Sequence, residues 1–240
     1  VKCIKRCGLE VSDLILQPLA SSTAVLTEDE KELGVCLVDV GGGTTDIAVF
    51  KQGAIRHTAV VPIAGDQITN DVAVAFRTPN QSAEEIKIKY GCALRQLAEP
   101  RAVVEVPGVD GRDARQLSLQ TLAEVIEPRV VELYEFVLNE LRRSGMEEMI
   151  ASGIVVTGGS AMMRGMVELG EEIFHMPVRL GMPRYVGGLS EVVGNPRYAT
   201  GVGLVLMGKQ QVERHLQGQM ESGSFGRVLE KMKSWFQGNF

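Results

Sequence analysis

The chain has 240 residues, 45% of them hydrophobic and 23% charged, a composition typical of a globular protein with a core of its own. Its formal net charge of −5 argues against general nucleic-acid binding, which favours a basic surface. No apolar run reaches the roughly 18 residues of a membrane-spanning helix, and the scattered cysteines (Cys3, Cys7, Cys36 and Cys92) indicate reduced thiols of a cytosolic protein.

The first 34 residues read as a strand, a short helix, a second strand over 14–16 and a helix from about Ala20 to near Gly34. The chain opens on Val1 without an initial turn. We therefore expect it to be the C-terminal portion of a longer protein.

Three consecutive antiparallel strands are predicted over 35–40, 45–50 and 54–62. The first is almost entirely apolar, which is typical of a strand buried on both faces in the middle of a sheet. Gly53 lies in the tight turn between the second and third strands.

The turn between the first two strands carries the most informative motif, Leu37 to Phe50, LVDVGGGTTDIAVF. Three adjacent glycines allow backbone angles that a Cβ forbids, so that successive N–H groups can converge on an anion. Thr44 and Thr45 add hydroxyl donors at the same rim. Asp39 and Asp46 flank this loop, which makes sense for phosphate only if a hard divalent cation with its water shell lies between. A plain hairpin is the alternative, but it needs neither the third glycine nor the acids.

The remaining elements alternate between helices and short strands. Ser82 is the expected N-cap of the helix over 83–90, with Glu85 completing a capping box. Pro128 is expected to kink or restart the longest helix, which covers 118–143. A further helix is expected to hold Met162, Met163, Met166 and Leu169. The predicted helices cover 65–76, 83–90, 118–143 and 196–207, and the predicted strands cover 101–106, 114–119, 154–157 and 177–180.

Two further motifs accompany the glycine loop. Gly153 to Ser160, GIVVTGGS, is a strand that runs into a Gly-Gly turn and a helix N-terminus, where a flat ring or a phosphate can approach the backbone. This pattern is also common in ordinary packing. Glu84 and Lys87 lie on one face of a helix. They are either a solvated ion pair or, in a nucleotide-binding protein, ligands of the ribose or the adenine edge.

The C-terminal segment, SFGRVLEKMKSWFQGNF, follows a polar stretch with the composition of a linker. The spacing of its apolar residues predicts an amphipathic helix that lies in a membrane interface. The alternative is a helix that docks on the protein's own body or on a partner. The apolar stripe is Phe225, Val228, Leu229, Met232, Trp235 and Phe236, and the flanking cations are Arg227, Lys231 and Lys233.

The glycine loop resembles the phosphate 2 loop of the actin/Hsp70/sugar-kinase superfamily, and GIVVTGGSA resembles its adenosine motif. Within that superfamily the chain resembles the FtsA family of bacterial cell-division proteins, through LQPLASSTAVLTEDEKELGVCLVDVGGGTTDIAVF, QTLAEVIEPR, GIVVTGGSA and the amphipathic tail. The resemblance covers essentially the whole chain.

This resemblance implies an α/β fold: an actin-like, RNase-H-like lobe called 2A, with a small inserted α+β subdomain called 2B and the N-terminal lobe absent. The expected boundaries are 1–34 for the end of domain 1 and the connection, 35–67 and 143–208 for 2A, 68–142 for 2B, 209–224 for a flexible linker and 225–240 for a membrane-targeting helix.

The resemblance also implies that ATP and Mg²⁺ bind between two lobes. Asp39 and Asp46 would hold the metal through water. The residues that would contact the nucleotide are Gly41, Gly42, Gly43, Thr44, Thr45, Glu84, Lys87, Gly158, Gly159 and Ser160. Because the opposing lobe is not in this sequence, we expect weak or no ATP binding and no useful hydrolysis from this chain alone.

The implied role is an ATP-binding adaptor that tethers the FtsZ ring to the cytoplasmic face of the inner membrane at the division site. The implied partners are the C-terminal peptide of FtsZ, with Glu124 and Arg129 as candidate contacts, other divisome proteins, further copies in actin-like filaments, and the membrane surface. An Hsp70-like chaperone, a sugar kinase and a pilus-assembly (PilM-like) ATPase are the alternatives. An Hsp70 needs a β-rich domain after the lobe, and the PilM-like relative lacks a lipid-binding helix.

Overall fold

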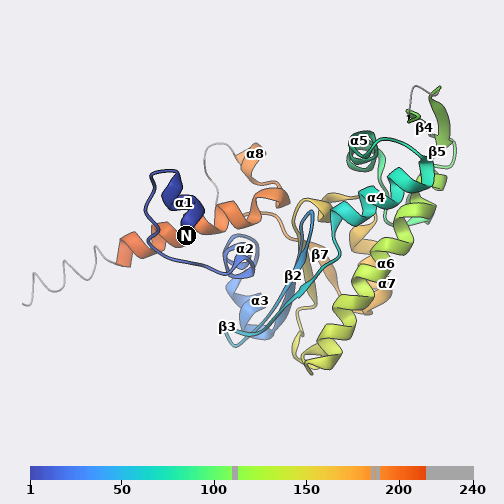
Figure 1. Cartoon of the computed structure of the whole chain (residues 1–240). Helices are drawn as coiled ribbons and strands as arrows, with labels where there is room; N and C mark the ends of the chain where they lie inside the picture. The colour runs from blue at the N-terminus through green and yellow to red at the C-terminus, as the bar shows by residue number, and fades with distance from the viewer. Residues whose placement is uncertain (110–112, 185–186, 188–189, 215–240) are drawn as a thin grey trace, which may run out of the picture.

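The structure is a computed structural model, which describes residues 1–109, 113–184, 187 and 190–214. A five-stranded sheet forms its centre (Figure 1), and its strand order is β3-β2-β1-β6-β7. Antiparallel pairing joins β1 to β2 and β2 to β3, whereas β1, β6 and β7 run parallel. The strands are β1 (Val35–Val40), β2 (Thr45–Lys51), β3 (Ala54–Val61), β6 (Ile154–Thr157) and β7 (Val178–Leu180).

The middle strand β1 is buried along its whole length, as its apolar run predicts. Alternate residues of a strand point to opposite faces of the sheet. Val38 and Val40 accordingly join one core cluster, and Val35 and Leu37 join another. The predictions of a central strand and of three consecutive antiparallel strands are confirmed.

Helices cover both faces of the sheet (Figure 1). The larger cluster packs α4 (Gly65–Phe76), α6 (Leu119–Arg143) and α7 (Met166–Phe174) against one face. The smaller cluster packs α2 (Gln17–Val25) and Ala199 against the other. Ala199 belongs to a helix that covers residues 199–214.

Beyond the sheet lie α5 (Asn80–Tyr90) and the hairpin of β4 (Val103–Val106) and β5 (Arg115–Ser118). Val104 and Val106 of this hairpin belong to the same core cluster as the sheet. Helix α6 runs from the hairpin along the sheet (Figure 1), and it continues through Pro128 without a restart. The proposed 68–142 boundary of an inserted subdomain stays a prediction.

The N-terminal 34 residues differ from the prediction. Residues 2–6 form the short helix α1 (Lys2–Arg6), and 14–16 have no regular structure. The expected single helix is two helices, α2 and α3 (Glu28–Leu33), because Thr27 caps the second one in a capping box with Glu30. Strong local capping therefore outweighs the continuous pattern.

Three other helix predictions need correction. Helix α5 begins at Asn80 after Pro79, so Ser82 and Glu85 lie inside it and form no cap. Gly165, with φ +86°, separates a 3₁₀ turn at Ser160–Met162 from α7. Helix 199–214 extends past the predicted end at 207, so 209–214 is helix and not linker. The other short elements are α8 (Ser190–Val193) and 3₁₀ turns at Arg95–Leu97, Glu147–Met149 and Pro196–Tyr198.

Candidate functional site

A cavity of about 410 Å³ lies at the ends of β1 and β6. It brings together residues of the glycine loop (Gly41, Gly42), the Glu84–Lys87 pair and the second Gly-Gly turn (Gly159, Ser160), although more than 40 positions separate each set from the next. The lining residues are Gly41, Gly42, Asp66, Glu84, Lys87, Ile88, Gly159, Ser160, Met162, Met163 and Arg197.

The glycine loop presents its backbone to this cavity. The Gly41 N–H donates to the carbonyl of Thr44 over 3.0 Å, which closes the turn. The next N–H groups, of Gly42, Gly43 and Thr44, are in an exposed segment and donate to no protein acceptor in the part of the chain that the structure describes. Consecutive unoccupied N–H groups of this kind form an anion-binding concavity.

The reason for glycine in this loop differs from the prediction. None of the three glycines has a positive φ, so forbidden backbone angles do not explain them. At Gly42 the space is limited, because a Cβ there would lie 3.1 Å from Asp66 Oδ1 and the Asp66 side chain would have to shift slightly. The absence of a side chain lets the start of α4 approach the loop, where the Asp66 N–H donates to the Gly42 carbonyl over 2.8 Å.

Thr44 and Thr45 have different environments. Thr44 is exposed at the loop, as expected for a rim donor. Thr45 is fully buried, and its hydroxyl donates to the Ile63 carbonyl over 2.7 Å. The expectation that Thr45 presents a hydroxyl at the rim is therefore wrong, because the strand alternation turns this side chain into the core.

Asp39 and Asp46 face each other directly across the β1–β2 pair. Asp39 is 3% and Asp46 is 9% exposed. Burial raises the pKa of Asp39, and hydrogen bonds from Ser21, Gln17 and Thr200 offset part of this rise. Burial and then the Asp39 charge raise the pKa of Asp46. The two carboxylates repel each other and lie beside an anion-binding loop. This arrangement fits a Mg²⁺ ion, which is typically bound by one or two carboxylates together with waters and phosphates.

The Gly-Gly turn after β6 lies against the glycine loop. Gly158 has φ +91°, and a Cβ there would be 2.4 Å from the Val40 carbonyl oxygen and 2.5 Å from Asp39 Oδ1. The Ser160 hydroxyl donates to the Gly41 carbonyl over 2.9 Å. Only a three-residue 3₁₀ turn starts at Ser160, so the predicted helix N-terminus and its dipole are absent at this point.

Glu84 and Lys87 form an ion pair of 2.7 Å at the edge of the cavity. The pair is not a solvated one, because Lys87 is 6% exposed and its ammonium also donates to the Gly65 carbonyl (2.9 Å) and to Thr69 Oγ1 (2.8 Å). Burial opposes ionisation of Glu84, but hydrogen bonds from Lys87 and Thr69 and the lysine charge lower its pKa overall. Glu84 thus presents a half-exposed, ionised carboxylate to the cavity.

Sequence reasoning missed several lining residues. Arg197 reaches the cavity from the 3₁₀ turn at Pro196–Tyr198, and Asp66 from the start of α4. Ile88 and Met162, exposed by 65% and 45%, give the cavity an apolar wall together with Met163. The methionines stood out only as helix residues, and no local signal marked Arg197.

The candidate partner residues already have partners inside the chain. Arg129 Nε donates to Asp71 Oδ2 over 2.6 Å and joins α6 to α4. Glu124 pairs with Arg95 over 3.2 Å. Their assignment to a protein contact stays a prediction. The predicted membrane residues of 225–240 lie outside the described residues, and none of the described helices is long and apolar enough to cross a membrane.

Comparison with known proteins agrees with the motifs and the fold. The family model described as "Cell division protein FtsA" matches residues 36–203. The cell division protein FtsA of Pseudomonas aeruginosa is 60% identical over 245 residues, which cover 100% of this chain and 59% of that protein. The chain thus spans about three fifths of the length of this curated relative.

Solved structures show the fold. MreB5 of Spiroplasma citri bound to ADP superposes with a TM-score of 0.72 at 18% identity, covering 89% of this chain and 64% of that one. A PilM–PilN type IV pilus biogenesis complex gives a TM-score of 0.64 at 19% identity, covering 85% and 55%. The chain therefore has the fold of an actin-like lobe, and its sequence is far more similar to FtsA than to the PilM-type alternative.

Proposed function

Because the chain belongs to the FtsA family of cell division proteins, we propose that its cavity binds ATP with Mg²⁺ and that nucleotide binding controls assembly rather than substrate turnover. The observation that carries this proposal is the arrangement of donors and carboxylates at the glycine loop. Three N–H groups of the loop have no protein acceptor among the described residues, and they lie beside the facing carboxylates of Asp39 and Asp46. This arrangement suits phosphates and a hard cation together.

The cavity and the loop and carboxylates next to it have separate roles in this proposal. The N–H groups of Gly42, Gly43 and Thr44 bind phosphate oxygens, and Arg197, which lines the cavity next to Gly159, adds a cation. Asp39 and Asp46 hold Mg²⁺ through its waters; when bound, the ion neutralises phosphate charge. Gly159 lets the nucleoside approach the backbone, Met162 and Ile88 offer an apolar face to the base, and Glu84 accepts from a ribose hydroxyl.

Lys87 has a supporting role. Its ammonium is occupied by Glu84, Thr69 and the Gly65 carbonyl, so it orients the Glu84 carboxylate instead of reaching the nucleoside itself. The proposal concerns binding: we propose that this chain, which spans about three fifths of its curated relative, binds the nucleotide weakly but measurably, with at most weak ATPase activity. Its support is the site geometry together with the ADP-bound MreB5 structure, which has the same fold.

We further propose that the chain is part of an actin-like adaptor that tethers the FtsZ ring to the cytoplasmic face of the inner membrane at the division site. In this proposal residues 225–240 insert their apolar stripe into the membrane interface, the region around α6 binds the C-terminal peptide of FtsZ, and further copies and other divisome proteins associate with the lobe. Family membership and the actin-like fold support this role.

Titration calorimetry with Mg·ATP tests the nucleotide site. Gly159 is exposed, and a Cβ there meets nothing closer than 3.9 Å, so Gly159→Leu folds but fills the cavity. We expect at least a tenfold loss of affinity. Gly208→Leu, at a helix position with open space, is the matched control and binds as the wild type. Equal affinities of wild type and Gly159→Leu would contradict the proposed site.

Co-sedimentation with anionic liposomes tests the tether. We expect the 240-residue chain to sediment with the lipid and a variant without 225–240 to stay in the supernatant. A synthetic FtsZ C-terminal peptide, followed by fluorescence anisotropy, tests the second contact, and both proteins are expected to bind it equally. Lipid binding that survives the deletion would show that the tail assignment is wrong.

A further inference from the structure

Two hydroxyl groups hold one oxygen of the buried Asp39 carboxylate. The Ser21 hydroxyl donates to Asp39 Oδ2 over 2.6 Å. Thr200 Oγ1 lies 2.9 Å from Ser21 Oγ and 3.5 Å from the same Asp39 oxygen. The three residues come from α2, β1 and helix 199–214, so a helix near the end of the described chain contacts the carboxylate of the candidate site.

The arrangement fixes the orientation of the carboxylate. The other oxygen of Asp39, Oδ1, points towards Gly158, where an added Cβ would be 2.5 Å away. Ser21 is 0% exposed and Asp39 is 3% exposed, so water does not replace the Ser21 hydroxyl easily; Thr200 is half-buried. A buried carboxylate without such donors costs free energy and loses its orientation.

The first turn of helix 199–214 is packed tightly on α2. A Cβ at Gly203 would lie 1.8 Å from the Ala20 carbonyl oxygen, so the two backbones are in contact at this point. Ala199 is 1% exposed in the small core cluster. Thr200 therefore lies in a stretch of the helix whose position is closely determined by α2.

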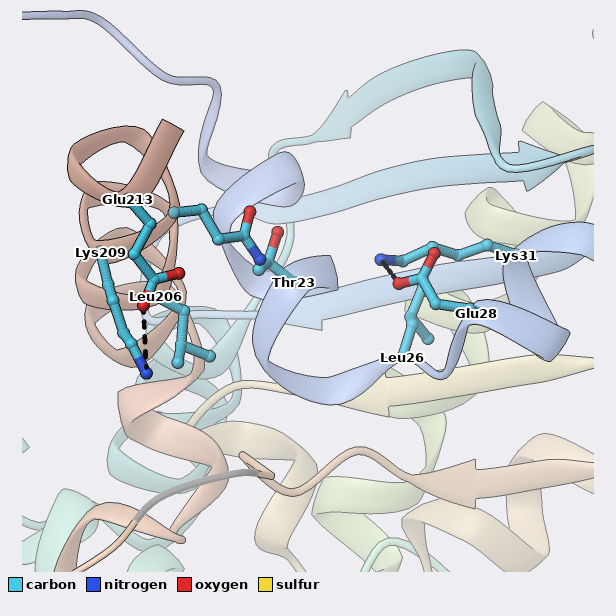
Figure 2. Close-up of a pocket in the computed structure, with 8 residues that line it drawn as sticks. Thr23, Leu26, Glu28, Lys31, Leu206, Lys209 and Glu213 are labelled. Atoms are coloured by element: carbon cyan, nitrogen blue, oxygen red, sulfur yellow. Dashed lines mark hydrogen bonds and ion pairs between the residues drawn. The ribbon is translucent and has the colours of Figure 1, made fainter. Parts of the chain in front are cut away.

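The later turns of the helix have no such anchor. A groove of about 610 Å³ lies between them and the α2–α3 segment, with Leu206 and Lys209 on one side and Leu26 and Lys31 on the other (Figure 2). Lys209 pairs with Glu213 (3.7 Å) and Lys31 with Glu28 (2.9 Å). Each pair stays on its own helix, and within the described residues no ion pair crosses the groove. The helix is thus held at its start and separated from α3 further on.

We propose that Ser21 and Thr200 are positioning residues for Asp39, through which docking of helix 199–214 and binding of a Mg²⁺–nucleotide favour each other. The inference rests on the proposed function, since Asp39 must act on the metal. If the hydroxyls orient the carboxylate that the ion needs, then the ion must in turn stabilise the docked helix, because coupling between two binding equilibria is reciprocal.

The test removes the Thr200 hydroxyl at constant shape. Thr200→Val is compared with two controls. Thr200→Ser keeps a hydroxyl at this position, and Thr23→Val removes a hydroxyl that donates to the Leu19 carbonyl and not to Asp39. Calorimetry measures the affinity for ADP with Mg²⁺ and for ADP with EDTA. We expect Thr200→Val to weaken the affinity for ADP with Mg²⁺ about fivefold and to leave the affinity for ADP with EDTA unchanged. Thr200→Ser and Thr23→Val are expected to behave as the wild type.

Hydrogen exchange of the amides of 199–207 provides a readout apart from affinity. Mg·ADP is expected to slow this exchange in the wild type but not in Thr200→Val. Ser21→Ala is a second variant with the same expectations, should Thr200→Val fail to fold. A Thr200→Val protein that binds Mg·ADP as tightly as the wild type overturns the coupling alone, as does an equal loss with EDTA. A wild type that binds no nucleotide under either condition overturns the proposed function and this inference together.

Discussion

The hydroxyl of Ser160 donates a hydrogen bond of 2.9 Å to the backbone carbonyl of Gly41, although 119 positions separate the two residues. The same carbonyl accepts the N–H of Gly65 at 3.1 Å. A Cβ at Gly65 would lie only 2.4 Å from Ser160 Oγ. The loops after β1 and β6 and the start of α4 therefore meet at one carbonyl oxygen, and this contact assembles the cavity.

Ser160→Ala removes this contact between the loops. We expect the free energy of unfolding to fall by about 1 kcal/mol, the usual value of one such hydrogen bond, and the affinity for Mg·ATP to fall several-fold because the loop N–H groups lose their support. Urea denaturation and calorimetry measure the two effects. Ser144→Ala, which removes a hydroxyl bonded only within the end of α6, is the control and retains full affinity.

Gly158→Ala introduces a clash as well as an unfavourable backbone angle. The new Cβ meets the Val40 carbonyl and the Asp39 carboxylate at 2.4 and 2.5 Å, so we expect a loss of more than about 3 kcal/mol. Gly145→Ala is the matched control, since Gly145 also has a positive φ (+69°) but nothing within 4 Å. It should cost about 1 kcal/mol. Equal melting temperatures of the two variants would contradict the close approach at Gly158.

Lys87→Met leaves the Glu84 carboxylate without its cation, and we expect a loss of about 2 kcal/mol at pH 7. Because the pKa of Glu84 is lowered in the folded protein, its stabilisation is present above its unfolded pKa and is lost as the pH falls through the folded pKa. The difference between wild type and Lys87→Met should therefore shrink on acidification below about pH 4.5. Urea titrations from pH 7 to 3 measure it.

Lys89→Met provides the comparison for that series, because Lys89 lies on the same helix but is exposed. We expect its stability to follow that of the wild type at every pH. A Lys87→Met difference that stays constant with pH would show that the lysine acts through packing and not through the Glu84 charge.

Asp46→Asn removes one of the two facing carboxylates. Burial and then the charge of Asp39 raise the pKa of Asp46, so its stabilising contribution is present at low pH and is lost as the pH rises through the folded pKa. Without ligand we expect the variant to be more stable than the wild type at pH 7, by about 0.5–1 kcal/mol, with the gain vanishing in acid. With Mg²⁺ we expect about tenfold weaker ATP binding.

Thermal unfolding with and without Mg·ATP measures both effects of Asp46→Asn. The exposed Asp13→Asn is the control and changes neither. A variant that is less stable than the wild type without ligand would show that the two carboxylates do not repel each other, and unchanged Mg·ATP affinity would remove Asp46 from the metal site.

The central strands were predictable because their signal is local. An apolar run such as Val35–Val40 can be buried only between two layers, and the glycine turn behind it leaves the antiparallel order as the simplest connection. The helix ends were less predictable. At Thr27 and Gly165 a capping box and a positive φ interrupt patterns that hydrophobic spacing alone continues.

The site was predictable only in part, for the same reason. The sequence by itself determined the glycine loop, the two flanking aspartates and the second Gly-Gly turn, because each is a short motif whose chemistry depends on neighbouring residues. Tertiary structure decided that Thr45 is buried on Ile63, that Lys87 is held by Gly65 and Thr69, and that Arg197 and Thr200 reach the site. Those contacts join residues far apart in the chain, and only the packing of helices on both faces of the sheet brings them within bonding distance.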